Sequence, residues 1–201
     1  ILGREDRAEA LIGFCTEKLE AVYSRLKKIN KPAPKVYLEV GYKGASEYGI
    51  SCGDASCGSF VREAGGLRIA LPIMGEKCQA LSPEYVLEQN PDLIILTGRN
   101  WATPGSVKMG YLASAEDARN SIAPFLKRPG WDGLKAAADK RVYGVYHGFC
   151  FSIYYFVAAE AFAKWNYPEE FQEVDPTATL KEYHERFMPI DYSGTFFLSH
   201  F

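Results

Sequence analysis

The first hydrophobic pattern along the chain is helical. Between residues 4 and 28, apolar side chains recur every three or four positions, at Ala8, Ile12, Cys15, Leu19, Val22 and Leu26. Charged residues fill the positions between them, so the pattern predicts one long amphipathic helix with a single apolar face. A helix of this length spans roughly 37 Å at 1.5 Å per residue, which suggests that it bridges two parts of a protein.

Three short apolar runs predict β-strands, at residues 35–40, 92–97 and 141–146. The second, DLIILT, is apolar at four consecutive positions, which is typical of a strand buried on both faces of a parallel sheet. The Gly- and Ser-rich segment 41–57 is expected to be a long loop. Helical patterns cover residues 57–64, 82–90, 114–126, 131–138, 152–165 and 177–187.

This alternation of strands and helices predicts an α/β fold with a mostly parallel central sheet flanked by helices. We expect one lobe over residues 31–201, preceded by the long bridging helix in residues 1–30. The chain starts at Ile1 without an initiator Met or a signal segment, so we interpret it as a fragment whose upstream part is missing.

Composition narrows the class of protein. The 201 residues are 47% hydrophobic and 24% charged, as in soluble globular proteins. Because 25 Asp and Glu balance 23 Lys and Arg, no basic excess favours nucleic acid as a partner. No run approaches the ~20 consecutive apolar residues of a membrane-spanning helix.

Chemically versatile side chains follow the three predicted strands. The six candidates are Tyr42 and Lys43 after the first strand, Arg99 and Trp101 after the second, and His147 and Phe149 after the third. In open α/β sheets ligands bind beyond the carboxyl ends of the strands, so we expect these side chains at one ligand-binding edge. A guanidinium suits anionic oxygens, aromatic rings stack on flat or apolar groups, and His or Tyr can coordinate a metal. The aromatic rings also suit a core, and a lone His often has a purely structural role.

The cysteines form no recognisable metal motif. They number five, at positions 15, 52, 57, 78 and 150, without a CxxC pair. We interpret them as small buried or loop thiols, with a disulfide and a metal or redox site as less favoured alternatives. We expect His184 and His200 to be surface residues.

An enzyme is a further alternative. Cys150 and Ser152 lie close to His147, so a Cys–His or Ser–His nucleophile is conceivable in a hydrolase or redox enzyme. The sequence has no GxSxG motif, no Gly-rich phosphate loop and no GxGxxG after the first strand. We therefore expect a non-enzymatic protein with no resident cofactor.

Six segments, in order, resemble one family, the class III substrate-binding proteins of ABC importers. The segment 3–22 resembles the helix that joins that family's two lobes, and PKVYLEV resembles the first strand of its second lobe. The remaining four are REAGGLRIA, SPEYVLEQNPDLIILT, RPGWDGLKAAADKRVYGVYHGF and FQEVDPTATLKEYHERFMP. The last resembles the tail of the iron-type subgroup, and together the segments span nearly the whole chain.

The resemblance implies a Rossmann-like C-terminal lobe with its interlobe helix, whose N-terminal lobe would lie upstream. It implies capture of an iron complex, a ferric siderophore or haem, and delivery to an ABC permease dimer with its ATPase. His147 with Tyr42 would suit a ferric or haem centre, whereas Arg99 and Lys43 would suit an anionic siderophore. Molybdate or tungstate is the alternative ligand.

The resemblance also implies a docking residue and a location. Family members dock on the permease through a surface glutamate on each lobe, and the matching residue here is Glu84. They work at the periplasmic or extracellular face of the cytoplasmic membrane. Any membrane anchor would belong to the N-terminal part.

Overall fold

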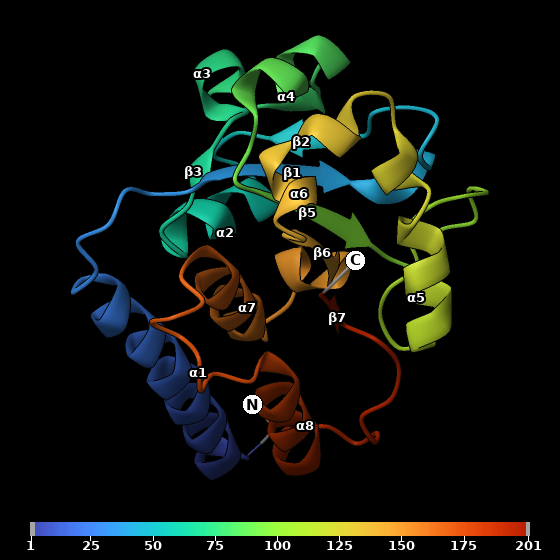
Figure 1. Cartoon of the computed structure of the whole chain (residues 1–201). Coiled ribbons are helices and arrows are strands. Elements are labelled where there is room, and N and C mark those ends of the chain that lie inside the picture. Colours follow the sequence, from blue (N-terminus) through green and yellow to red (C-terminus); the bar gives the residue numbers. More distant parts are fainter. Residues whose placement is uncertain (1–2, 200–201) are drawn as a thin grey trace.

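A mixed β-sheet forms the centre of the protein (Figure 1), whose computed structural model describes residues 3–199. The sheet order is β4-β2-β1-β5-β6-β7, with β3 beside β1. Strands β1, β3, β5 and β6 run parallel, whereas β2, β4 and β7 pair antiparallel with their neighbours. The strand bounds are β1 Lys35–Val40, β2 Ile50–Cys52, β3 Leu67–Arg68, β4 Cys78–Ala80, β5 Leu93–Gly98, β6 Val142–Tyr146 and β7 Phe197–Leu198.

Helices cover both faces of this sheet (Figure 1). Helices α1, α2, α7 and α8 pack on one face, and α4, α5 and α6 pack on the other. Their bounds are α1 Glu5–Leu26, α2 Cys57–Glu63, α3 Leu71–Met74, α4 Pro83–Gln89, α5 Ala115–Ile122, α6 Lys135–Ala138, α7 Phe156–Asn166 and α8 Pro176–Phe187. Short 3₁₀ segments lie between these elements: η1 Gly41–Lys43, η2 Phe125–Lys127, η3 Trp131–Gly133 and η4 His147–Phe151.

The two cores follow from the alternation of side chains along each strand. On β1, Val36 and Leu38 enter the core under α7, whereas Tyr37 enters the opposite core. All of β5 is buried, because a central parallel strand has helices on both sides. The predicted α/β fold and the doubly buried second strand are therefore confirmed.

The apolar face of α1 differs from the predicted stripe. Phe14 and Val22 are buried, but Ile12 is 64% exposed and Ala8 is exposed. Successive residues of a helix are about 100° apart, so a face centred on Phe14 turns Ile12 to the solvent. The strict four–three spacing passed over Phe14, the residue that anchors the helix.

The segment 41–57 is more ordered than the expected loop. It contains η1 and then β2, which extends the sheet beside β1 with Val40 opposite Ile50. The helix predicted from residue 152 begins only at Phe156. The 3₁₀ turn η4 occupies residues 147–151, and Ser152 after it has an extended backbone. Both differences lie where the chain leaves the carboxyl end of a strand, which is the edge where we expected the ligand.

Candidate ligand-binding site

Three neighbouring parallel strands, β1, β5 and β6, end at the same edge of the sheet. The loops that follow them bring Tyr42, Trp101 and His147 to one hollow of about 420 Å³. This volume lies within the usual range of small-molecule pockets. The other lining residues are Val40, Ile50, Cys52, Ser56 and Cys78.

Aromatic rings form a continuous row along this pocket. The ring centroids of Tyr42 and Trp101 are 6.4 Å apart, and those of Trp101 and His147 are 5.4 Å apart. Phe151 extends the row, 5.5 Å from the His147 ring, and its side chain is 72% exposed. Such a row offers flat, apolar contact to a ligand with an aromatic or macrocyclic surface.

His147 is held at the end of β6 by buried neighbours. Its Nδ1 lies 2.9 Å from Oγ1 of Thr97, a fully buried residue of β5. Burial, and secondarily the positive charge of Arg99, lowers the pKa of His147 to about 4. The imidazole is therefore neutral at pH 7, which is the state that coordinates a metal.

Two disulfide bonds border the site. Cys52 and Cys78 face each other across β2 and β4 and are joined. Cys57 at the start of α2 is joined to Cys150 in η4. The interpretation of these four residues as thiols is therefore wrong, and Cys15 is the one free thiol within residues 3–199. Each bond joins residues far apart in sequence, which only the folded sheet brings together.

The other predicted ligand residues lie outside this pocket. Lys43 forms an ion pair with Glu47, with 3.1 Å between Nζ and Oε2. Arg99 is exposed and absent from the pocket lining. Phe149 is 1% exposed and stacks on Phe197 at 5.3 Å between ring centroids. We therefore assign Phe149 to the core rather than to the ligand pocket.

Two further sequence expectations concern residues away from the pocket. Glu84 is exposed in the first turn of α4, where Ser82 caps the helix by accepting a hydrogen bond from Tyr85 N. His184 is 1% exposed, with Nε2 3.3 Å from the Tyr111 hydroxyl. Its expected position on the surface is wrong, because α8 turns this residue toward the core. His200 lies outside the described residues.

A buried ion pair holds the loop between Tyr42 and β2. The Arg128 guanidinium donates two hydrogen bonds, of 2.6 and 2.9 Å, to the Glu39 carboxylate, and both side chains are almost fully buried. Arg128 also donates to the carbonyls of Ala45 and Glu47, at 2.9 and 2.7 Å. The Gly49 amide donates to Glu39 at 2.7 Å. One ion pair thus fixes both ends of the loop beside the pocket.

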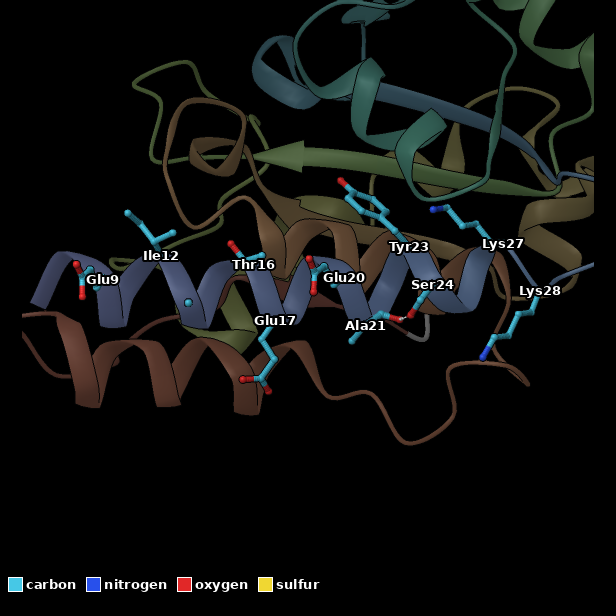
Figure 2. A pocket seen from close by; sticks show the side chains of 11 residues that line it. Glu9, Ile12, Thr16, Glu17, Glu20, Ala21, Tyr23, Ser24, Lys27 and Lys28 are labelled. Carbon is cyan, nitrogen blue, oxygen red and sulfur yellow. Dashed lines mark hydrogen bonds between the residues drawn. The ribbon is translucent and has the colours of Figure 1, made fainter. Parts of the chain in front are cut away.

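A larger hollow lies elsewhere, on α1 (Figure 2). It measures about 1210 Å³, and its lining residues all belong to α1 or are the two lysines that follow it. Ile12, Thr16 and Glu20 are among them. A surface made by one helix lacks the convergent polar groups of a small-molecule site, so we do not assign the ligand to it.

Comparisons with known proteins identify the family. The sequence model described as "Periplasmic binding protein" matches residues 1–146. The crystal structure of a TroA-like periplasmic binding protein, FepB from Veillonella parvula, covers all of this chain at 39% identity with a TM-score of 0.96. The chain belongs to the periplasmic binding protein family. It spans 58% of the length of that FepB chain, and no curated protein sequence matches it.

More distant structures of the family share the fold. A haem-binding protein from Pseudomonas aeruginosa is 22% identical with a TM-score of 0.63, over 84% of this chain and 56% of that one. The molybdate-bound protein MolA from Haemophilus influenzae is 19% identical with a TM-score of 0.66, over 92% and 52%. None of the helices within residues 3–199 is both long and apolar enough to cross a lipid bilayer.

Proposed function

We propose that this chain is part of the substrate-binding component of an ABC importer and that it captures an iron complex, a ferric siderophore or haem. The observation that carries the proposal is the pocket in which Tyr42, Trp101 and a neutral His147 meet at the carboxyl edge of the sheet. Imidazole and phenol groups are iron ligands, and aromatic rings cover the apolar surface of a macrocycle.

The arrangement of charge favours an iron complex over a bare oxyanion. Arg99 and Lys43 are absent from the pocket lining, and Lys43 is already paired with Glu47. Molybdate or tungstate would require cations or several N–H donors that converge on it. The hydrolase alternative also loses support, because the Cys57–Cys150 disulfide leaves Cys150 without a free thiol.

The pocket can be tested by thermal unfolding of the whole chain with haem, ferric siderophores, molybdate or tungstate. A ligand at 100 times its Kd stabilises the native state by about 2.7 kcal/mol. We expect stabilisation by one iron complex, which His147→Ala weakens at least about tenfold. Glu84→Ala, in α4 outside the pocket, is the matched control and should bind as the parent does. Stabilisation by oxyanions alone would overturn the proposal.

We also propose that α1 is the interlobe helix and that Glu84 docks the protein on its permease. One face of α1 packs on α7 through Phe14 and Val22, while Ile12 remains 64% exposed on the other.

The docking role of Glu84 can be tested by transport. The pairing of this acidic residue, at the start of a helix, with permease arginines at the outer face of the membrane would be salt-dependent. Transport measured with the full-length protein should fall in Glu84→Ala and remain in Glu88→Ala, an exposed change on the same helix. Normal uptake with Glu84→Ala would exclude the docking role.

A further inference from the structure

Two sulfur atoms and one imidazole converge between α2 and η4. Cys57, His147 and Cys150 each offer one metal-ligating atom, and the three atoms lie within 4.8 Å of one another. Within residues 3–199 this is the one group of three His, Cys, Asp or Glu side chains with such a geometry. The pocket described above uses the ring of His147 but neither sulfur atom.

The distances fit a tetrahedral thiolate–imidazole site. In such a site, metal–sulfur bonds of about 2.3 Å and metal–nitrogen bonds of about 2.1 Å place sulfur and nitrogen roughly 3.6 Å apart. Cys57 Sγ and His147 Nδ1 are 3.8 Å apart. The two sulfur atoms are bonded to each other in the structure, so they must separate to about 3.8 Å before they can bind one ion.

Of these two cysteines, Cys150 is the more accessible, because it is half-buried whereas Cys57 is buried. Cys150 lines a second hollow of about 250 Å³, together with Phe60, Glu63, Phe149, Ser152 and Tyr155. The Ser152 hydroxyl there is buried and has no hydrogen-bond partner among the described residues. An attacking thiolate could therefore approach Cys150, whereas Cys57 is 2% exposed.

We propose that reduction of the Cys57–Cys150 disulfide creates a binding site for one soft divalent ion, such as Zn²⁺, with Cys57, Cys150 and His147 as ligands. A dithiol reductant supplies two electrons and two protons, its own sulfurs become a disulfide, and two thiols form on the chain. The metal ion then displaces both thiol protons, and His147 Nδ1 exchanges its contact with Thr97 for the metal.

The charge of this site suits its surroundings. Two thiolates and one divalent cation carry no net charge, so the bound state avoids the large desolvation cost of an unpaired buried ion. The disulfide and the metal-bound state exclude each other, because they use the same two sulfur atoms. The inference does not rest on the proposed function, since metal binding is measured without an iron complex or a permease.

The chain contains its own matched control. The Cys52–Cys78 disulfide borders the ligand pocket as well, but neither cysteine belongs to the metal-ligating group. Reduction therefore produces two dithiols in one molecule, of which only one has an imidazole ligand. Variants that remove one pair at a time separate the proposed site from nonspecific binding by thiols.

Co²⁺ is the probe, because its bonds to thiolates give charge-transfer absorption. The whole chain, reduced with a phosphine and transferred without oxygen to metal-free buffer, should bind one equivalent of Co²⁺ and release it to Zn²⁺. C52S/C78S should behave as the parent does. C57S and C150S should each lose the charge-transfer band, and His147→Ala should weaken Co²⁺ binding at least about tenfold.

Three results would overturn the site. They are a reduced parent chain without thiolate–cobalt absorption, a band that survives C57S but disappears in C52S/C78S, and unchanged affinity in His147→Ala. Circular dichroism of the reduced variants is the check that each is folded. The oxidised parent chain should give no charge-transfer band, and a band there would also contradict the proposal.

Discussion

Glu160 is a carboxyl group in the middle of α7, between alanines that are completely buried. Its side chain is 6% exposed, and its Oε2 has no hydrogen-bond partner among the described residues. Burial raises the pKa of Glu160 from 4.5 to about 7. Of the facing groups, Thr179 and Lys18 oppose this shift, whereas the nearby acids, Asp175 and Glu182, add to it.

This raised pKa predicts that the free energy of unfolding falls as the pH increases. Between pH 4.5 and about 7 the folded chain holds a proton on Glu160 that the unfolded chain releases. The contribution of Glu160 is therefore complete below pH 4.5 and is lost as the pH rises through about 7. Glu160→Gln should flatten this dependence and stabilise the chain at pH 8, as measured by urea unfolding at several pH values.

Glu88→Gln, at an exposed position of α4, is the control for this measurement. It should keep the pH dependence of the parent chain. If Glu160→Gln also kept the pH dependence of the parent chain, the buried carboxyl would not be the source of that dependence.

Single residues also show where prediction of the site stopped. His147 and Phe149 follow the same strand, but a 3₁₀ turn has three residues per turn, so positions two apart face in different directions. His147 reaches the pocket, whereas Phe149 enters the core. The sequence could not distinguish the directions of His147 and Phe149, because a short 3₁₀ turn has no hydrophobic periodicity that would reveal it.

Among the elements, the loop between η1 and β2 depends most on one interaction. Arg128 lies over the rings of Tyr48 and Phe125, at 4.3 and 4.5 Å, while it holds the Glu39 carboxylate. Removal of one partner of a buried ion pair leaves the other charge unpaired, which costs about 3–5 kcal/mol. Arg128→Met should therefore lower the free energy of unfolding by about that amount in urea titrations.

Lys31→Met is the matched control. Lys31, like Arg128, forms ion pairs, in its case with two glutamates, but its side chain is 50% exposed. Solvent screens such surface pairs, so this variant should unfold almost as the parent does. Equal, small losses in the two variants would show that the Arg128–Glu39 pair does not hold the loop.

Element length decided which parts of the fold were predictable. The strands β1, β5 and β6 are five or six residues long and mostly apolar, so their hydrophobic pattern was sufficient. The strands β2, β4 and β7 have two or three residues, too few to show a period of two. They exist because a neighbouring strand supplies hydrogen-bond partners, which is a tertiary effect.

In the whole molecule, the disulfides are the feature that local patterns could least reveal. Cys52–Cys78 joins two adjacent strands and closes a loop of 26 residues. Cys57–Cys150 connects α2 to the segment after β6 and closes a loop of 93 residues. The cysteines had no diagnostic spacing, because the sheet order β2-β1-β5-β6 and not the sequence brings them together.

The two loop lengths predict unequal contributions to stability. A cross-link stabilises mainly by restricting the unfolded chain, and the chain-entropy estimate is about 3.5 kcal/mol for the shorter loop and about 4.7 kcal/mol for the longer. C57S/C150S should therefore lower the free energy of unfolding by more than C52S/C78S, in urea without reductant and on a Cys15→Ser background that prevents exchange. A larger loss from C52S/C78S would contradict this order and would mean that local pairing of β2 with β4 limits the stability of the chain.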